Sequence, residues 1–329
     1  MASLESGLPW LVADIGGTNA RFGWVADAAT GVQHVLKMPV AMYADPAEAI
    51  QAYLGELRRV LGAATPAPRK AAIAVATPIE GDWIGLTNAR WGFSRSALTA
   101  EFKLDALLVI NDFEAQALSL PRLGAAQLRA FGALPVPRGV LAVIGPGTGL
   151  GVGGVVQTAH GWIPVPGEGG HVTLAPGNDF ESRLLDAARR EYPHVSAERL
   201  LSGIGLPVLH SALASVLGQA AGPLAAEVIV ERAIAGTDAL CGQTIDLFCA
   251  LLGSFAGNVA LTLGARGGVY IGGGIVPRLG DRFFGSEFRE RFVAKGRFRG
   301  YLEAIPTALI TDTLAALSGA ALAIEQHGR

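Results

Sequence analysis

The opening stretch of the chain, Leu11 to Val25, predicts a β-hairpin. An apolar run that contains one acid, Asp14, enters the turn Gly16-Gly17-Thr18-Asn19, and a second apolar run, Phe22 to Val25, leaves it. Glycine tolerates the positive φ angles of tight turns and lets an anion approach the main chain. The pattern therefore predicts two paired strands whose turn presents backbone N–H groups. An ordinary hairpin with an aspartate in its ladder has the same pattern, so this stretch alone leaves phosphate binding open.

The rest of the first 120 residues alternates between strand-like and helix-like patterns. Asp45-Pro46-Ala47-Glu48 is typical of a helix start, with Asp at the N-cap, Pro at the first helical position and Glu in the first turn. Short apolar runs predict strands, whereas apolar residues three and four apart predict helices. The expected strands cover 32–40, 71–76 and 107–110, and the expected helices follow Asp45 and cover 114–123. This order predicts a sheet with antiparallel and parallel parts.

The second half of the chain begins with a copy of the opening pattern. Val140 to Val156 again contains an apolar strand, a turn of glycine and threonine, and a second strand. Gly17-Thr18 corresponds to Gly147-Thr148, about 130 residues later. Such a repeat indicates an internal duplication. A nucleotide would fit between two turns of this kind, since each supplies backbone N–H donors for phosphates.

Helical patterns dominate the remainder. The expected elements are a helix capped by Asn178, helices within 184–265, a strand at 269–271 inside a third glycine-rich segment (267–278), a helix over 286–295, a strand at 308–310 and a helix over 314–326. The segment 247–265 has 19 residues without a charge, close to a membrane-spanning length. Ser254, Asn258 and Thr262 form a polar stripe on it and glycines interrupt it, so we expect a buried core helix.

Composition limits the function classes. The chain has 329 residues, 50% of them hydrophobic and 16% charged, which suits two domains with large cores. A net charge of −2 argues against nucleic acid as a partner. Cys241 and Cys249 would lie about 12 Å apart along one helix, too far for a disulfide, and match no zinc pattern. Residues 1–10 lack a signal-peptide pattern, so we expect a cytoplasmic protein with no membrane partner.

Three nucleotide-binding patterns were compared. No Walker-type G-x-x-x-x-G-K-[ST] string occurs. Gly149 to Gly154 formally satisfies the dinucleotide pattern G-x-G-x-x-G, with Glu168 about 20 residues further on. However, the residues that follow continue as a strand and not as a helix. A duplicated actin-like ATPase, with two phosphate hairpins and a glycine-rich adenosine turn, accounts for all three glycine clusters and their order.

Six motifs now make the resemblance specific. The strings DIGGTNARFG, INDFEAQAL, IGPGTGLGVG, PGEGGHV, SAERLLSG and GGVYIGGGIVPR resemble, in this order and spacing, those of bacterial glucokinases of the hexokinase–actin superfamily. The related repressor–kinase sugar group carries a cysteine-rich zinc motif, and none follows His171. The resemblance implies an α/β, two-domain actin-like ATPase (ribonuclease H-like) fold with the active site in the interdomain cleft. The small domain would comprise 1–120 plus 312–329, and the large domain 121–311.

The resemblance also implies roles for the sugar-site residues. Asp112 would be the general base that takes the proton of the sugar's 6-hydroxyl, whereas from the residues alone a helix cap at Asn111-Asp112 is the better interpretation. Asn111, Asp112, Glu168, His171 and Glu198 would bind the sugar. From the residues alone, His171 fits a structural loop histidine and Glu198 a solvated helix residue.

The nucleotide residues follow in the same way. Asp14 would be the Mg²⁺-side acid, acting through water. Pro146 departs from the family pattern and removes one N–H from the second phosphate turn. The residues implied for ATP are Asp14, Gly16, Gly17, Thr18, Asn19, Thr148 and Gly149 on the phosphate side, and Gly272, Gly273 and Gly274 at the adenosine turn.

The expected activity is ATP-dependent phosphorylation of glucose at the 6-hydroxyl, with ATP and Mg²⁺ as cofactors, by a homodimer. One alternative is a kinase for another hexose or an amino sugar, such as mannose or N-acetylmannosamine. The other is a non-catalytic sugar sensor or an ATP-driven clamp on the same fold.

Overall fold

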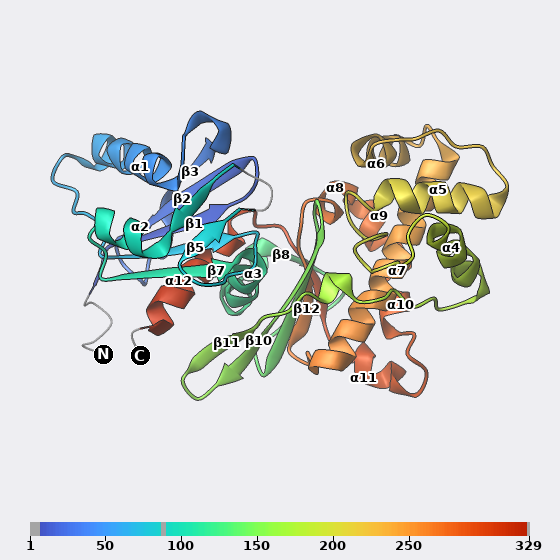
Figure 1. Cartoon of the computed structure of the whole chain (residues 1–329). Helices are drawn as coiled ribbons and strands as arrows, with labels where there is room; N and C mark the ends of the chain where they lie inside the picture. Colours follow the sequence, from blue (N-terminus) through green and yellow to red (C-terminus); the bar gives the residue numbers. More distant parts are fainter. Residues whose placement is uncertain (1–6, 87–89, 328–329) are drawn as a thin grey trace. The chain divides into compact units, whose positions relative to one another are not determined.

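The computed structural model describes residues 7–86 and 90–327 of the chain (Figure 1). It divides into two compact units. Unit 1 comprises Met1–Leu123, Thr158–Pro164 and Thr313–Arg329, and unit 2 comprises Gly124–Gln157 and Val165–Asp312. The C-terminal segment therefore belongs with the N-terminal part of the chain, together with a short segment from the middle.

Unit 1 is built on a five-stranded sheet with antiparallel and parallel pairs, as the sequence predicted. The strand order is β3-β2-β1-β4-β7. The pairs β1–β2 and β2–β3 are antiparallel, whereas β4 runs parallel to both β1 and β7. The strands are β1 (Trp10–Ile15), β2 (Asn19–Val25), β3 (Gln33–Pro39), β4 (Lys70–Val75) and β7 (Ala106–Asn111), and a separate ribbon pairs β5 (Trp83–Gly85) with β6 (Gly92–Ser94).

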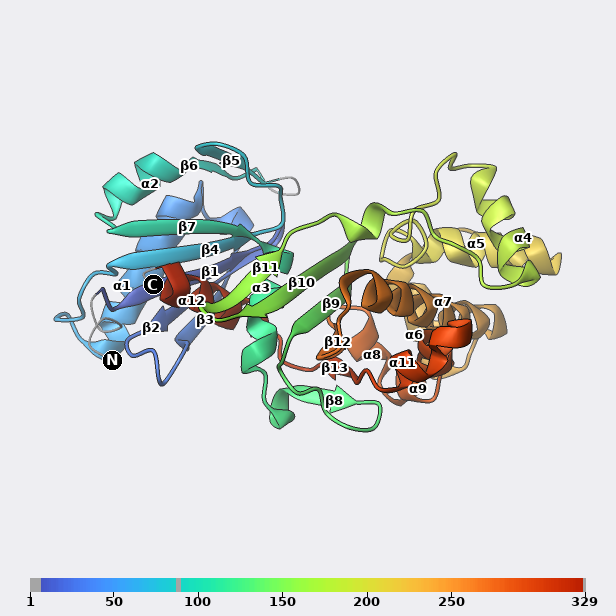
Figure 2. The same ribbon diagram turned by 90° about the horizontal axis from the view of Figure 1, so that it is seen from below.

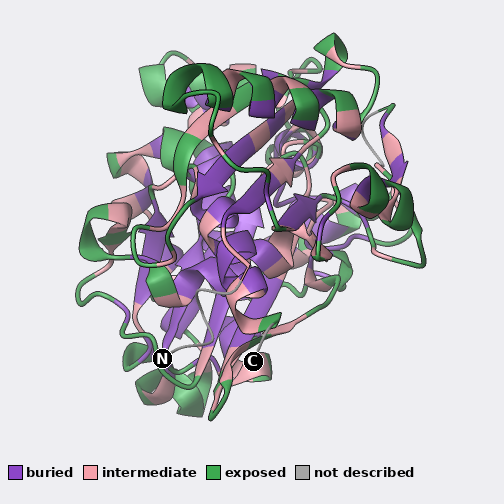
Figure 3. Cartoon of the chain, turned by 90° about the vertical axis from the view of Figure 1, so that its left-hand side faces the viewer, coloured by how far each residue is buried: buried purple, intermediate pink, exposed green. Residues whose placement is uncertain are grey.

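Helices cover both faces of this sheet. Successive residues of a strand point to opposite sides, so each buried strand contributes apolar side chains to both faces. Leu11, Ala13 and Ile15 pack in the apolar cluster that includes helix α1, whereas Trp10 and Val12 pack in the cluster that includes helix α12. The buried strands appear purple in Figure 3. The helices of unit 1 are α1 (Pro46–Leu61), α2 (Arg95–Glu101), α3 (Asp112–Ser119) and α12 (Ala315–His327), with short 3₁₀ turns at Val40–Met42 and Leu120–Arg122.

Two helix starts in unit 1 test the capping predictions. The side chain of Asp45 accepts the N–H of Glu48 at 2.9 Å, so the predicted start of α1 is confirmed. The helix expected over 114–123 begins earlier, at Asp112, because Asn111 is its N-cap. It also ends earlier, at Ser119, where the chain tightens into a 3₁₀ turn.

The second sheet has the strand order β11-β10-β9-β12-β13-β8. Its centre is parallel, since β12 runs parallel to both β9 and β13, and Figure 2 shows these three strands side by side. The pairs β9–β10 and β13–β8 are antiparallel. The strands are β8 (Leu128–Ala130), β9 (Val140–Pro146), β10 (Leu150–Thr158), β11 (Gly161–Val165), β12 (Gly268–Ile271) and β13 (Thr307–Ile310).

Unit 2 holds most of the helices. Asn178 caps the first of them, α4, as predicted. The helix expected over 286–295 is shorter than predicted and covers Phe288–Val293. The helices are α4 (Asp179–Arg189), α5 (Leu206–Leu217), α6 (Ala226–Ala235), α7 (Ala239–Leu263), α8 (Val276–Leu279), α9 (Asp281–Phe284), α10 (Phe288–Val293) and α11 (Arg299–Glu303), with 3₁₀ turns at Ala125–Gln127, Gly169–His171 and Gly296–Phe298.

The long apolar helix α7 forms the core of unit 2. By length and composition, it is the one helix among the described residues that could cross a membrane, but 67% of its most apolar window is buried within the protein. Gly253 and Gly257 let it approach α10 closely: a Cβ at these positions would lie 2.1 Å and 2.5 Å from the carbonyl oxygens of Phe288 and Phe292. Both cysteines are buried and unbridged on α7, as expected.

Within unit 1, the C-terminal helix α12 packs against α3 through a similar close contact. A Cβ on Gly319 of α12 would lie 1.7 Å from the carbonyl oxygen of Ala115 on α3. Backbone sits against backbone at this crossing, so neither helix has a flexible side chain that could move aside.

We therefore expect Gly319→Ala to destabilise the protein. The overpacking should lower the free energy of unfolding by about 1–3 kcal/mol, despite the better helix propensity of alanine. Urea unfolding, monitored by circular dichroism, measures the change.

Gly55→Ala is the matched control, because Gly55 lies inside α1 and a Cβ there meets nothing within 4 Å. Without a clash, this substitution should stabilise the protein by about 0.5–1 kcal/mol. A Gly319→Ala variant as stable as Gly55→Ala would contradict the packing argument.

Candidate functional site

In unit 1, the first predicted phosphate turn and Asp112 lie at the same edge of the sheet. Ile15 of β1 is paired with Val75 of β4, and Val75 is paired with Asn111 of β7. The three parallel strands therefore end level with one another. Since neighbouring strands lie about 4.8 Å apart, the ends of β1 and β7 are separated by about 10 Å. Ligands of open α/β sheets bind at the carboxyl edge, where these residues lie.

Asn111 and Asp112 form the start of α3. The Asn111 Oδ1 accepts the N–H of Phe113 at 2.8 Å, and the Asp112 Oδ1 accepts the same N–H at 3.0 Å. The Asn111 Nδ2 donates to the carbonyl oxygen of Thr77 at 3.5 Å. The helix-cap interpretation is therefore correct, and it also fixes the half-buried Asp112 carboxylate at a helix N-terminus, which favours negative charge.

Sequence reasoning did not single out Glu114, which lies in the first turn of the same helix. Burial raises the pKa of its carboxyl, and a hydrogen bond from the backbone of Asn111 opposes part of that rise. Its only sequence signal is an acid in the first turn after a capping asparagine.

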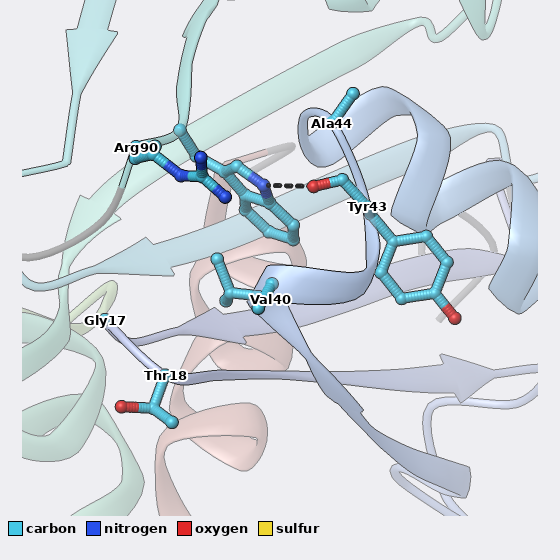
Figure 4. A pocket seen from close by; sticks show the side chains of 8 residues that line it. Gly17, Thr18, Val40, Tyr43, Ala44 and Arg90 are labelled. Carbon is cyan, nitrogen blue, oxygen red and sulfur yellow. Dashed lines mark hydrogen bonds between the residues drawn. The ribbon is translucent and has the colours of Figure 1, made fainter.

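The first glycine-rich turn is exposed at its tip and held by backbone hydrogen bonds at its base. Gly17 and Thr18 are exposed, and the N–H of Gly16 donates to the carbonyl oxygen of Asn19 at 3.0 Å. The N–H of Val40 donates to the carbonyl oxygen of Thr18 at 2.9 Å, which ties the turn to the chain after β3. Beside it lies a hollow of about 510 Å³, shown in Figure 4. The residues that line it are Gly17, Thr18, Val40, Ala41, Tyr43, Ala44, Arg90 and Trp91.

Asp14 lies two residues before this turn and is paired with a cation. Its Oδ2 is 3.0 Å from Nη1 of Arg21, and its side chain is 18% exposed. Burial raises the pKa of Asp14 above its ordinary value, and the Arg21 guanidinium opposes part of that rise. No group of three or more His, Cys, Asp or Glu side chains that could hold a metal occurs among the described residues. A single carboxylate still suits Mg²⁺, which is commonly held by one or two carboxylates, waters and substrate phosphates.

In unit 2, the second turn repeats the first with one residue fewer. Pro146 is paired with Leu150 across three residues, whereas Ile15 and Ala20 enclose four. The N–H of Gly147 donates to the carbonyl oxygen of Gly149 at 2.8 Å and closes the turn.

The second turn is anchored from outside, like the first. The N–H groups of Gly203 and Ile204 donate to the carbonyl oxygens of Gly147 and Thr148, at 2.7 Å and 3.2 Å. Thr148 is therefore held through its carbonyl oxygen in the same way as Thr18, its counterpart in the duplication.

The third glycine cluster lies directly against the second turn. The N–H of Gly272 donates to the carbonyl oxygen of Ile144 at 2.8 Å, and that of Ile275 to the carbonyl oxygen of Pro146 at 3.1 Å. Gly273 has a φ of +75°, and a Cβ there would lie 2.3 Å from the Pro146 carbonyl oxygen. Glycine at this position therefore permits the close contact of the two segments.

The three remaining sugar-site residues converge at the same turn. The Glu198 Oε2 accepts the N–H of Leu150 at 2.9 Å, and its Oε1 is 3.9 Å from Nδ1 of His171. The His171 Nε2 is 4.0 Å from Oε2 of Glu168. A Cβ on Gly149 would lie 2.5 Å from the Glu198 Oε2, so the carboxylate lies directly over the phosphate turn.

The structure bears on the alternative interpretations of Glu198 and His171. Glu198 lies in a turn and not in a helix, and its side chain is 20% exposed, so the solvated-helix interpretation is wrong. The His171 side chain is 60% exposed, and its ring nitrogens lie 4.0 Å and 3.9 Å from carboxylate oxygens of Glu168 and Glu198, so both interpretations of this loop histidine stand.

The loop that carries Glu168 and His171 is anchored by a residue that sequence reasoning missed. Glu181 of α4 is 1% exposed, and it accepts the N–H of Gly177 at 2.6 Å and an Nδ2 hydrogen of Asn178 at 3.2 Å. Its Oε1 also lies 2.5 Å from Nη2 of Arg291 on α10. Removing one partner of such a buried pair typically costs about 3–5 kcal/mol. The available signal was the capping pattern Asn178-x-x-Glu181, which predicts a cap but not the arginine.

Comparisons with known proteins identify the family of the chain. The glucokinase family model matches residues 11–327. A glucokinase from Neisseria meningitidis serogroup C is 44% identical over 326 residues, which cover 99% of this chain and 97% of that protein. A glucokinase from Chromobacterium violaceum is 46% identical over 332 residues, covering 98% of this chain and 92% of that protein.

A solved structure supports the same assignment. The crystal structure of a glucokinase from an Antarctic psychrotroph superposes with a TM-score of 0.88 at 39% identity, covering 96% of this chain and 98% of that one. The expected actin-like ATPase fold is thereby confirmed. The family model, the curated relatives and the solved structure each match nearly the whole chain, so the protein belongs to the glucokinase family.

Proposed function

We propose that this protein transfers the γ-phosphoryl group of ATP to the 6-hydroxyl of glucose. The observation that carries the proposal is the convergence of Glu168, His171 and Glu198 at the Thr148–Gly149 turn. These groups would read sugar hydroxyls beside a turn suited to phosphate, in a chain 44–46% identical to glucokinases.

The sugar-binding chemistry follows from the donors and acceptors in this cluster. Carboxylates accept hydrogen bonds from hydroxyls, and an imidazole either donates or accepts, so together they suit the adjacent hydroxyls of a hexose. Because the N–H of Leu150 already orients the Glu198 carboxylate, little entropy of this side chain is lost when a sugar binds. Asn111 would supply one more amide contact.

The nucleotide would be held mainly by backbone N–H groups. The turns Gly16–Asn19 and Gly147–Gly149 would contact the phosphates, and Gly272–Gly274 would accommodate the adenosine. When bound, Mg²⁺ would neutralise charge on the phosphate oxygens, with Asp14 holding one of its waters.

Asp112 would act as the general base. Its carboxylate takes the proton of the 6-hydroxyl while the sugar oxygen forms a bond to the γ-phosphorus and the bond to the ADP oxygen breaks. A positioned base of this kind typically contributes about 10²–10⁴-fold to the rate. The start of α3 places this carboxylate at a helix N-terminus, where negative charge is favoured.

The wider assignments rest on the family. We propose a cytoplasmic homodimer with no membrane or nucleic-acid partner, in which residues 1–120 plus 312–329 and residues 121–311 act as the two domains. An assay of ADP release across glucose, mannose and N-acetylmannosamine tests the substrate. Preference for another sugar would replace glucose in the proposal, and sugar-independent ATP hydrolysis would contradict it.

The role of Asp112 predicts a selective loss of turnover. Asp112→Asn should lower kcat by about 10²–10⁴-fold, because the amide cannot accept the proton. Glucose binding, measured by calorimetry, should change little. Asp105→Asn is the matched control, since Asp105 lies at the other end of the same strand and pairs with Arg69 on the surface. Near-normal turnover of Asp112→Asn would rule out the base.

The sugar cluster predicts a loss confined to one ligand. His171→Ala should weaken glucose binding by about tenfold to a hundredfold, because a sugar hydroxyl loses its hydrogen-bond partner, while ATP affinity stays within about twofold. Calorimetry with each ligand in turn measures both values. His160→Ala, an exposed histidine between β10 and β11, is the control. Equal weakening of both ligands would show a general structural defect instead.

The raised pKa of Asp14 predicts that ionising this group costs stability. A folded-state pKa above the unfolded value gives a stability contribution that is present at low pH and is lost as pH rises through the folded pKa. The asparagine of Asp14→Asn does not ionise, so this variant does not lose stability as Asp14 does when pH rises. Its melting temperature relative to wild type should therefore rise as pH increases from about 4 to 7, while the KM for Mg·ATP increases.

Scanning calorimetry across this pH range, with enzyme assays at neutral pH, provides both measurements. Glu80→Gln removes an exposed carboxylate from the same unit and serves as control. A melting-temperature difference that does not change with pH would show that Asp14 is not strained by burial.

A further inference from the structure

Unit 2 contains a second hollow, of about 220 Å³, that the proposed reaction does not use. It lies where Arg138 and Gly267 lead into β9 and β12. The rest of its wall comes from the chain after β8 and from the segment Glu303–Pro306 between α11 and β13.

Three arginines line this hollow: Arg138, Arg266 and Arg289. Its one acidic residue, Glu303, is shared: its Oε1 accepts Nε–H of Arg299 at 3.0 Å, and its charge also favours the charged form of Arg289. Within residues 7–86 and 90–327, neither Arg138 nor Arg266 forms a hydrogen bond or an ion pair with a carboxylate. The hollow is therefore positively charged and its two exposed guanidinium groups have no protein counter-ion.

The arginines are partly held in place before any ligand arrives. Arg289 donates to the carbonyl oxygens of Ile305 and Glu303, both at 2.9 Å, and burial lowers its pKa. The guanidinium carbon of Arg266 lies 5.6 Å from the ring centre of Tyr301. Pre-positioned cations lose less side-chain entropy when they bind an anion.

The remaining wall is apolar. Phe131 contributes an aromatic surface, and Leu134 and Val136 are 42% and 60% exposed at the rim. The volume is below the range of about 300–1,000 Å³ that is typical of pockets for drug-sized ligands. A ligand with an anionic head and a short carbon body fits this chemistry, whereas a whole nucleotide is too large.

The hollow is remote from the proposed nucleotide turn. It lies at the start of β9, and the turn follows the last residue of this strand, Pro146. At about 3.3 Å per residue, a strand of 7 residues is about 23 Å long. A ligand here would not contact the phosphates of a nucleotide bound at Gly147–Gly149.

We propose that this hollow is a separate binding site for a small organic anion, a phosphate ester or carboxylate of about three carbons. The site stands independently of the kinase assignment, because it rests on residues that the reaction does not use.

Calorimetry on the full chain tests the proposal. Saturating glucose and a non-hydrolysable ATP analogue fill the proposed active site first, so that added anions report on other sites. The probes are inorganic phosphate, glycerol 3-phosphate and malonate, which distinguish a phosphate head from a carboxylate. At least one should bind the wild-type protein, and the double variant Arg138→Gln/Arg266→Gln should bind it at least about tenfold more weakly.

The double variant Arg183→Gln/Arg190→Gln is the matched control, because it removes the same charge from the exposed surface of α4. It should bind the probes as wild type does. Three results would overturn the proposal: no probe binds, both double variants lose affinity equally, or sedimentation shows that Arg138→Gln/Arg266→Gln changes only the oligomeric state. The last result would identify the hollow as a contact between copies of the chain.

Discussion

The site in unit 2 depends on the hydrogen bond from the N–H of Leu150 to the carboxylate of Glu198. This contact joins the proposed sugar-binding cluster to the proposed phosphate turn, so that one side chain contacts both. A side chain at position 149 would disturb this contact, since a Cβ there would lie 2.5 Å from the same carboxylate oxygen. Glu198 is itself fixed by its own N–H, which donates to the carbonyl oxygen of Gly170 at 2.8 Å. The position of Glu198 in the proposed site is thus set by hydrogen bonds with backbone groups of Leu150 and Gly170.

Behind this contact lies a second layer of support. The buried Glu181 holds the end of the loop that carries Glu168 and His171, and Arg291 on α10 neutralises it. Further back, Lys295 donates to the hydroxyl of Ser254 on α7 at 3.1 Å, so the polar stripe that interrupts this apolar helix has a partner. A charge buried this deeply is destabilising unless it is paired, which means that the loop can hold one arrangement only while α4 and α10 remain packed.

The two repeated turns share the same kind of anchoring hydrogen bond but differ in length and sequence. Both turns carry a threonine whose carbonyl oxygen accepts an N–H from a later segment, Val40 for Thr18 and Ile204 for Thr148. The turn in unit 2 is one residue shorter and begins after Pro146, whose carbonyl oxygen accepts the N–H of Ile275 next to the third glycine cluster. The absence of an N–H at Pro146 therefore leaves the turn closed, because the N–H of Gly147 does the closing. The two turns therefore differ by one residue in length and by the proline that precedes the second turn.

Local patterns were sufficient for much of this protein. Local apolar patterns predicted the five strands of the first sheet and the strands β9, β10, β12 and β13 of the second, but neither of its edge strands, β8 and β11. Capping residues predicted the start of α1 at Asp45, and glycine and proline placed the turns, because these features depend on residues near one another in the chain. The family motifs supplied candidate roles that no local pattern contained. What the tertiary structure decided was which distant groups meet: Glu198 with Leu150, Gly273 with Pro146, Glu181 with Arg291, and α12 with α3 through Gly319. Periodicity carries no information about such pairs, since each depends on the packing of elements far apart in the chain.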